Sequence, residues 1–455
     1  MTKNSTKPIL QTRSLNMQVL AIATPLVLQN VAQTLLGVID TWFISSIGTE
    51  AIAALGLAGV IFFTFYVFYR NSLNALVAFV GRAHGAGDDK KIGDIVWRGI
   101  SVAGLLSLTV IILPWLFTYI MSWAAPADSG RVAEYGALYM RIRSIEIPIA
   151  MFTAVGWAFL VGRGDSRTPM FMMWGMVAIN IFLDWVMVPG NLGVPALGVA
   201  GAAWATVLAN LCNLIVTGLI LWSPRNRAKF DTGRPRLTPW ADIRKVIEVG
   251  LPAGFGDFIE IASFSVFFAF IGRLGTETLA ANQIAVQYMS ISFTFGLAIS
   301  MAASSLVSQF VGAGDPSTAE KAAYRALAIG MIGMGLIGLT YIIAPAFLMG
   351  IFTDDATVIN AGVSILSIIA LYQIFDGAGI VLSGALMGGG DTRFTMLTRL
   401  ILAWGFFLPM AWLAIFRLDR GVSGAWVAAL IYLVTLAITY FLRFRSGKWK
   451  EFELT

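Results

Sequence analysis

The sequence predicts an all-α membrane protein with twelve transmembrane helices in two parallel six-helix bundles. Three observations lead to this fold class: the composition, the lengths of the apolar runs and an internal repeat. Of the 455 residues, 58% are hydrophobic and only 12% are charged, and the mean hydropathy is +0.79. Soluble chains usually carry roughly 25% charged residues, so an ordinary globular enzyme is excluded. A lipid bilayer is the solvent that such a composition requires.

The apolar runs are continuous rather than alternating, which favours helices over a membrane β-barrel. A helix that crosses a bilayer with some tilt needs about 20 to 25 residues. In the first half of the chain, the predicted spans cover 16–43, 50–82, 92–121, 131–161, 168–188 and 198–222. In the second half, they cover 244–272, 278–310, 319–349, 357–387, 394–416 and 422–443.

Basic residues are concentrated on one side of the predicted membrane, and such residues accumulate in cytoplasmic loops. This side contains Lys3, Lys7, Arg13, Arg82, Lys90, Lys91, Arg163, Arg167, Arg225, Arg227, Lys229, Arg234, Arg236, Lys321, Arg325, Arg393, Arg443, Arg445, Lys448 and Lys450. The opposite side contains only Arg131, Arg273, Arg417 and Arg420. We therefore predict a multi-pass protein of the cytoplasmic (inner) membrane with both termini cytoplasmic. The net charge of +6 indicates contact with membrane lipids, and no nucleic-acid partner is expected.

A polar stretch at 223–245 is predicted to be a cytoplasmic linker between an N-lobe, 1–222, and a C-lobe, 246–455. Short motifs of the N-lobe recur in the C-lobe. Gly-Thr-Glu at position 48 returns at 275, and Gly-Ala-Gly-Asp at position 85 returns at 312, 227 residues later in both cases. Such a constant offset indicates an internal repeat. Because each repeat has an even number of spans, the two lobes are predicted to be parallel and related by an axis along the membrane normal.

Four polar residues lie at similar predicted depth in the outer half of the N-lobe. A charge at bilayer depth costs at least about 2.5 to 3.5 kcal/mol, so each needs a reason. Asp40 lies near the outer end of its span, Asn180 and Asp184 share one helix face, and Thr206 lies about 12 Å inside the bilayer. These oxygens suit a monovalent cation or a proton. Asp184 has a second interpretation, as a span-end residue that reaches the headgroups.

Two carboxylates also lie at membrane depth in the C-lobe. Glu260 is near the middle of its span, and Asp376 is close to the midplane of another, with Tyr372 one turn away on the same face. A pair of buried carboxylates is typical of a cation or proton site.

Each of these C-lobe carboxylates has an alternative interpretation, as half of a structural ion pair with an intramembrane arginine. The arginines considered are Arg70, Arg141 and Arg143. The alternative applies with more force to Glu146, because two of these arginines are close to it in sequence. Asp257, one turn before Glu260, fits either interpretation.

Enzyme chemistry is not expected from this sequence. It has one histidine and one cysteine, too few for a His/Cys metal cluster, and no phosphate-binding Gly-x-x-x-x-Gly-Lys-Ser/Thr loop. The Gly-Gly-Gly-Asp run at 388–391 resembles an intramembrane protease motif, but it is duplicated at 162–165 and lies at span ends. A tight turn followed by a helix N-cap explains it. No cofactor is therefore expected.

Taken together, the motifs resemble the multidrug and toxic compound extrusion (MATE) family over nearly the whole chain. The matching segments are 25–40 with Gln33, 180–184, 198–206, 250–254, 282–285, 312–314, 372–376 and 390–393. The resemblance implies two six-helix lobes around a central cleft. It also implies export of cationic and amphipathic organic compounds, such as drugs and dyes, by antiport with H⁺ or Na⁺, and we expect a monomer.

The resemblance carries the family's N-lobe cation site onto five positions of this chain. They are Asp40, Asn180, Asp184, Thr206 and, through its carbonyl oxygen, Ala202. The resemblance implies that the four side chains are able to coordinate Na⁺. We rank this site first for the coupling ion.

The resemblance also carries a C-lobe site onto Glu260, Tyr372 and Asp376, which we rank second, for substrate or a further cation. Pro25 is a predicted hinge, because proline removes an intrahelical hydrogen bond. The main alternative function is a lipid or lipid-linked-sugar flippase of the same two-lobed superfamily, which would need a strongly cationic cleft. A membrane-embedded enzyme and a passive channel are weaker alternatives.

Overall fold

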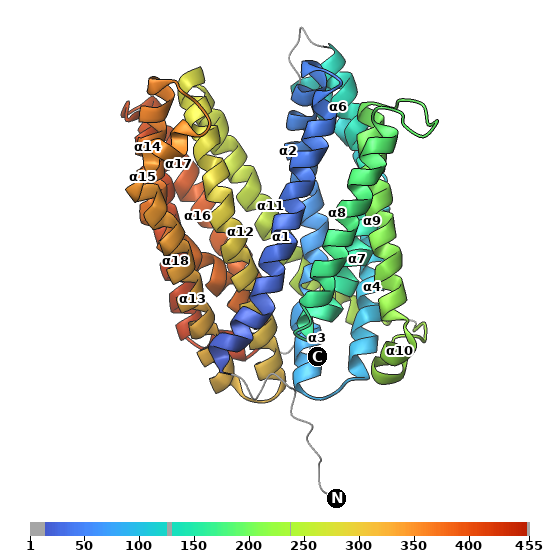
Figure 1. The fold of residues 1–455 in the computed structure, drawn as a ribbon. Helices are drawn as coiled ribbons and strands as arrows, with labels where there is room; N and C mark the ends of the chain where they lie inside the picture. Colours follow the sequence, from blue (N-terminus) through green and yellow to red (C-terminus); the bar gives the residue numbers. More distant parts are fainter. Residues whose placement is uncertain (1–13, 125–129, 237, 453–455) are drawn as a thin grey trace, which may run out of the picture. The chain divides into compact units, whose positions relative to one another are not determined.

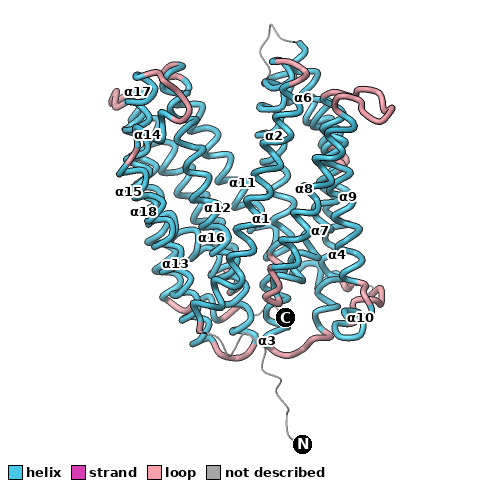
Figure 2. Tube along the Cα trace, in the orientation of Figure 1, coloured by secondary structure: helices cyan, strands magenta, loops and turns pink. Residues whose placement is uncertain are grey.

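The computed structural model describes residues 14–124, 130–236 and 238–452, and this part of the chain is helical without β-strands (Figures 1 and 2). Within it, twelve helices or consecutive helix pairs are long and apolar enough to cross a membrane. The predicted all-α class and the number of spans are confirmed.

Eleven of the helices in the described residues begin before residue 272. They are α1 (Leu15–Ser45), α2 (Thr49–Asn74), α3 (Leu76–Gly85), α4 (Lys91–Val110), α5 (Leu113–Ala124), α6 (Gly130–Arg143), α7 (Glu146–Gly162), α8 (Arg167–Met187), α9 (Val199–Leu221), α10 (Pro224–Phe230) and α11 (Trp240–Gly272). The remaining helices are α12 (Thr276–Gly312), α13 (Pro316–Ile343), α14 (Pro345–Gly350), α15 (Ala356–Gly388), α16 (Thr392–Leu402), α17 (Leu408–Phe416) and α18 (Gly421–Arg445). A π-helical turn, η2 (Ala403–Phe407), joins α16 to α17, and a 3₁₀ turn, η3 (Lys448–Lys450), follows α18.

Four predicted spans are divided between two consecutive helices, and the span at 394–416 contains the π turn η2. The span at 50–82 divides into α2 and α3, 92–121 into α4 and α5, 131–161 into α6 and α7, and 319–349 into α13 and α14. In the last three cases a proline stands at the start of the second helix, namely Pro114, Pro148 and Pro345. Proline has no N–H to donate to the preceding turn, and its ring clashes with that turn, so these helices restart. The apolar runs did not predict these breaks.

The described residues divide into two compact units. Unit 2 is Leu28–Phe258, and unit 1 comprises Met1–Val27 with Ile259–Thr455. The division falls inside α1 and inside α11, so each of these helices contributes to both units. The lobe boundaries predicted at 222 and 246 stay a prediction.

Glycines allow helices to meet backbone to backbone within each unit. In unit 1, a Cβ at Gly384 or Gly388 of α15 would lie 2.4 Å from the carbonyl oxygen of Ser300 or Ser304 of α12. In unit 2, a Cβ at Gly201 of α9 would lie 2.5 Å from the backbone oxygen of Met187. Small residues therefore set the spacing of the helices that carry the polar side chains described next.

Candidate functional site

A cluster of polar side chains in unit 2 joins α1, α8 and α9. The amide nitrogen of Asn180 faces Asp40 Oδ1 at 2.9 Å and Asp184 Oδ2 at 3.0 Å. These two carboxylate oxygens are therefore at most about 6 Å apart. Asn180, Asp184 and Thr206 are fully buried, at 0 to 1% exposure. The structure thus brings together residues that are up to 166 positions apart in the chain.

Neutral oxygens complete this cluster on α9. The hydroxyl of Thr206 donates to the carbonyl oxygen of Ala202 at 3.0 Å, and it lies 3.5 Å from the amide of Asn180. Asp184 Oδ1 is buried and has no hydrogen-bond partner among the described residues. A buried carboxylate oxygen without a partner is costly, and a bound proton or monovalent cation would satisfy it. The five N-lobe residues carried over from the resemblance therefore form one spatial group whose donor set fits a small cation.

A cavity of about 160 Å³ lies beside the cluster in the same unit. Most of its wall is apolar, aromatic or thioether. Its lining residues are Gln29, Gln33, Leu36, Gly59, Phe62, Phe63, Tyr66, Arg70, Arg143, Glu146, Ala150, Thr153, Ala154, Trp157, Leu160, Pro169, Met172, Met173, Met176, Asn210 and Asn213. Aromatic faces and flexible methionine side chains suit flat amphipathic ligands of varied shape.

The cluster and the cavity share three helix faces. Each helix presents a cluster residue and a cavity-lining residue four positions apart, which places both on one face about 6 Å apart along the axis. The pairs are Leu36 and Asp40 on α1, Met176 and Asn180 on α8, and Asn210 and Thr206 on α9. Apolar contacts among Ala32, Leu36, Met176, Val177 and Ala209 hold the three helices together.

A buried ion pair closes the cavity where α6 ends and α7 begins. Glu146 is 2% exposed, and its Oε2 accepts from Arg143 Nε at 2.6 Å. Its Oε1 accepts from Asn210 at 3.1 Å, and Arg143 also donates to the Tyr139 hydroxyl at 2.6 Å. The guanidinium lies over the Phe62 ring, 4.6 Å from its centroid. Of the two interpretations of Glu146, the ion pair is the one observed.

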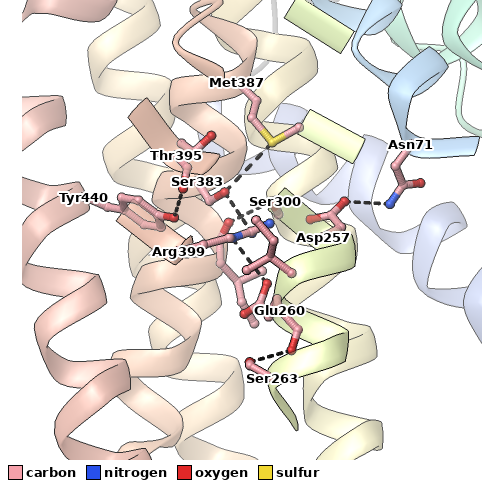
Figure 3. Close-up of polar contacts among 12 residues, drawn as sticks. Asn71, Asp257, Glu260, Ser263, Ser300, Ser383, Met387, Thr395, Arg399 and Tyr440 are labelled. Carbon is pink, nitrogen blue, oxygen red and sulfur yellow. Dashed lines mark hydrogen bonds and ion pairs between the residues drawn. The ribbon is translucent and has the colours of Figure 1, made fainter. Parts of the chain in front are cut away.

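The other polar residues near these helices have different partners. Asp257 accepts a hydrogen bond from Asn71 at 2.7 Å, and Figure 3 shows the two side chains pointing toward each other. Arg141 is exposed and makes no ion pair within the described residues. Arg70 lines the cavity and has no hydrogen-bond or ion-pair partner in the described part of the chain. Arg70 is therefore a charge that faces the cavity.

The predicted C-lobe residues lie in unit 1. Glu260 of α11 forms an ion pair with Arg399 of α16, with 3.3 Å between Oε2 and Nε. Asp376 of α15 is close enough to Glu260 to interact with it electrostatically. The Tyr372 hydroxyl donates to the Met289 thioether at 3.0 Å and makes no hydrogen bond to a carboxylate in the described residues. The structure thus places Asp376 within electrostatic range of Glu260 and directs the Tyr372 hydroxyl to sulfur.

Three residues at these sites were missed by sequence reasoning: Arg399, Asn210 and Tyr432, a fully buried tyrosine of α18 that interacts electrostatically with Glu260 and Asp376. Arg399 had a clear signal, because it is a charge five positions inside the predicted span at 394–416. Asn210 follows Thr206 by four residues, so its place on the same face was predictable. Tyr432 had no signal, because a tyrosine in an apolar helix is an ordinary core residue.

Comparison with known proteins now identifies the family. The family model described as MatE matches residues 25–186 and again 252–413, which together are more than half of the chain. The two matches begin 227 residues apart, the same offset as the paired motifs. The family model therefore detects the internal repeat independently of the paired motifs.

Curated relatives are similar over almost the full chain. The multidrug resistance protein NorM of Burkholderia vietnamiensis is 30% identical over 93% of this chain and 92% of its own length. A probable multidrug resistance protein NorM of Thermotoga maritima is 27% identical over 95% of this chain and 93% of its own length.

Solved structures share the fold. The eukaryotic MATE transporter AtDTX14 superposes with a TM-score of 0.86 at 20% identity, over 96% of this chain and 97% of its own. A multidrug resistance MATE family transporter in an outward-facing conformation gives 0.86 at 21% identity, over 97% and 98%. With a family model matched twice and relatives that span the whole chain, this protein belongs to the MATE family of membrane transporters.

Proposed function

We propose that this protein is an inner-membrane antiporter that exports amphipathic organic compounds, including cations, in exchange for H⁺ or Na⁺. One observation carries the proposal: the carboxylate cluster and the apolar cavity of unit 2 lie one helical turn apart on the same three helix faces. Antiport requires that ion and substrate influence each other, and shared helices supply a direct physical link. The multidrug resistance relatives support small-molecule export.

The cation binds at Asp40 and Asp184. Two carboxylates within about 6 Å in a buried site repel each other, and a proton or Na⁺ relieves this repulsion. Thr206, Ala202 and Asn180 add neutral oxygens that stabilise a metal ion, after the Asn180 amide turns its oxygen toward the carboxylates. A proton needs only one carboxylate.

The substrate binds in the cavity. Its flat apolar part packs on Phe62, Tyr66 and the neighbouring methionines, and its polar groups meet Arg70 and the glutamine and asparagine side chains. Because Arg143 is already paired with Glu146, the cavity is mainly apolar with one unpaired arginine in the described residues. A cationic substrate is attracted instead by the carboxylates of the cluster.

Coupling runs through the charged end of the cavity. Asp40 interacts electrostatically with both Arg143 and Glu146. When a cation neutralises the cluster, the attraction between Asp40 and Arg143 weakens, so the charge that faces the substrate changes. The cation must bind one conformation more tightly than the other in order to drive transport. One charge that crosses 100 mV supplies about 2.3 kcal/mol, enough for between one and two decades of substrate gradient.

Pro25 is our proposed hinge. Within α1 the division between the two units falls after Val27, two residues beyond this proline. A proline inside a long helix lowers the cost of bending, because one intrahelical hydrogen bond is already missing. The cytoplasmic side would carry the basic loops, and both termini would lie there.

The flippase alternative is less well supported. A flippase for a pyrophosphate-linked lipid needs a strongly cationic surface. The cavity of unit 2 presents two arginines, one of which is held by Glu146, and most of its wall is apolar.

The experiment is dye efflux from proteoliposomes in which Na⁺ and pH gradients are imposed separately. We expect wild-type efflux to follow at least one of the gradients and Asp40→Asn to lose coupled efflux at least 10-fold while staying folded. Glu50→Gln is the matched control, because Glu50 is an exposed carboxylate that pairs only weakly with Arg131, at 3.4 Å. Normal gradient-driven efflux by well-folded Asp40→Asn would overturn the proposed role of the cluster.

A further inference from the structure

Arg399 places a positive charge inside the second cluster of carboxylates, in unit 1. It lies seven residues into the helical stretch Thr392–Phe416, which is long and apolar enough to span a membrane. Its side chain is 12% exposed. A guanidinium in such a position is expensive and is kept where it has a defined partner. The family resemblance assigned three residues of this region, and Arg399 was not one of them.

Arg399 contacts residues of α11 and α15. Its Nε lies 3.3 Å from Glu260 Oε2 on α11, and its NH2 group donates to the Ser383 hydroxyl on α15 at 3.2 Å. Figure 3 shows the guanidinium between these two side chains. The separation from Glu260 is longer than that of the buried Arg143–Glu146 pair, which is 2.6 Å. Glu260 is also less enclosed, with 22% of its side chain exposed against 3% for Glu146.

A third helix, α18, carries a buried tyrosine that interacts electrostatically with the same charges. Tyr432 of α18 is fully buried, and its hydroxyl has no hydrogen-bond partner among the described residues. The charged groups that interact electrostatically with it include Glu260, Arg399 and Asp376. Its ring is held in place by stacking on Phe407, 5.1 Å between centroids. A buried hydroxyl without a hydrogen-bond partner in the described residues, within electrostatic range of two carboxylates, is an available oxygen ligand for a cation.

The backbone beside these residues is also unusual. Phe407 ends the π-helical turn Ala403–Phe407, which begins one turn after Arg399. From this turn, the Trp404 indole N–H donates to the carbonyl oxygen of Ile259, the residue before Glu260. Single π turns in α-helices are concentrated at functional sites. The π turn therefore anchors α11 and orients the tyrosine stack at the same place.

We propose that Arg399 is a tethered counter-cation that sets the charge of the unit 1 site and so limits it to one monovalent cation. The two carboxylates of Glu260 and Asp376 and the guanidinium of Arg399 sum to one negative charge. A single H⁺, Na⁺ or monovalent organic cation neutralises that charge. The entering cation shares Glu260 with Arg399, binds Asp376 and gains the Tyr432 hydroxyl, while Ser383 retains a hydrogen bond to Arg399. This inference extends the proposed cation-coupled export by naming a specificity-determining residue.

The test measures equilibrium binding of Na⁺, tetraphenylphosphonium and Ca²⁺ to the purified full chain in detergent. All variants carry Asp40→Asn and Asp184→Asn, so that the unit 2 cluster does not contribute. We expect Arg399→Gln to tighten binding of the monovalent cations at least 10-fold and to create Ca²⁺ binding, because the site then carries two negative charges. Glu260→Gln should weaken monovalent binding at least 10-fold, because Arg399 and Asp376 then neutralise each other.

The double variant Glu260→Gln/Arg399→Gln restores one negative charge, and it should bind monovalent cations within about 3-fold of the parent. This rescue also serves as the test if Arg399→Gln alone does not fold. Tyr432→Phe should weaken Na⁺ binding about 3-fold. Arg443→Gln is the matched control: it removes an arginine from the Arg443–Asp391 pair of the same unit, at 2.7 Å, and should leave cation binding unchanged.

A purely structural role for Arg399 gives a different pattern. In that case Arg399→Gln would bind cations no more tightly than the parent, or the double variant would stay as weak as Glu260→Gln, and either result overturns the proposal. These binding measurements do not depend on drug efflux. Failure of the proposed antiport would appear in the proteoliposome assay and leave the binding results as they are.

Discussion

At the scale of single residues, the Asn180 amide links Asp40 and Asp184 of the unit 2 cluster into one site. Its nitrogen bridges the two carboxylates, and its oxygen then lies on the side of the Thr206 hydroxyl. Neutral oxygens matter to a metal ion, which gains from every ligand, and matter little to a proton, which needs one carboxylate. The two coupling ions therefore depend differently on the same side chains.

Thr206→Val should separate the two ions. The change keeps the shape of the side chain and removes one oxygen, so the Na⁺ concentration for half-maximal dye efflux should rise about 5-fold or more. The response to pH at zero Na⁺ should change little. Thr217→Val is the control, because Thr217 is on the same helix and also donates to the carbonyl oxygen four residues earlier, at 2.8 Å. An unchanged Na⁺ curve would remove Thr206 from the coupling site.

Glu146→Gln should be strongly destabilising. It leaves the Arg143 guanidinium buried without its carboxylate, and breaking such a pair costs about 3 to 5 kcal/mol. The measurement is the free energy of unfolding in mixed micelles, by SDS titration. Glu50→Gln breaks an exposed pair and should cost less than about 1 kcal/mol. Equal losses in the two variants would contradict the structural role of the Arg143–Glu146 pair.

The sequence allowed the cluster residues of unit 2 to be predicted, because charge and depth are both readable from a span. The partners of the buried charges were harder to predict from the sequence. Glu146 has two arginines within five residues, and only the break between α6 and α7 decides that Arg143 reaches it while Arg141 is exposed. Glu260 pairs with a residue 139 positions away, and such a pairing depends on helix packing that no single span reveals.

At the scale of helices, most predicted ends lie within about four residues of the observed ones, because polar residues interrupt the apolar runs. Helix caps reinforce these ends. Asp315 precedes α13, and its Oδ1 accepts from the backbone N–H of Thr318 at 2.9 Å. The breaks after Val110 and Arg143 were not predicted, because hydropathy continues across them and only the prolines mark the restart.

Asp315→Ala should destabilise the protein by about 0.5 to 2 kcal/mol at pH 7, the usual value of an N-cap. The hydroxyl and the backbone N–H of Thr318 lower the pKa of Asp315 below its ordinary value. A lowered pKa stabilises the folded state above the pKa of the unfolded chain, and this contribution is lost as the pH falls through the folded-state pKa.

Thermal unfolding of wild type and Asp315→Ala at pH 7 and at pH 3 checks this sign, since the difference between them should shrink at the lower pH. Asp354→Ala, at an exposed position that makes no cap, is the control. A difference that grows as the pH falls would contradict the cap.

At the scale of the whole molecule, the distribution of basic residues predicts which ends of the helices face the cytoplasm. The chain has one cysteine, Cys212, so a Cys212→Ser background allows single cysteines to report accessibility. Asp354→Cys should react with an impermeant thiol reagent in intact cells. Asp88→Cys and Ser446→Cys should react only in everted vesicles. The reverse pattern would invert the proposed orientation.

The contact between α12 and α15 has a mechanical consequence. Where Gly384 and Gly388 bring α15 onto the backbone of α12, the closest side chain is the small Ser300, whose hydroxyl donates to the Ile380 carbonyl oxygen of α15 at 2.8 Å. We expect α12 and α15 to move as one rigid body, since sliding of one helix along the other would force backbone atoms into each other. Ser383 belongs to this rigid pair, whereas Glu260 belongs to α11. Arg399 is hydrogen-bonded to Ser383 and ion-paired with Glu260, so any displacement of α11 along the α12–α15 pair would change the geometry of these two interactions.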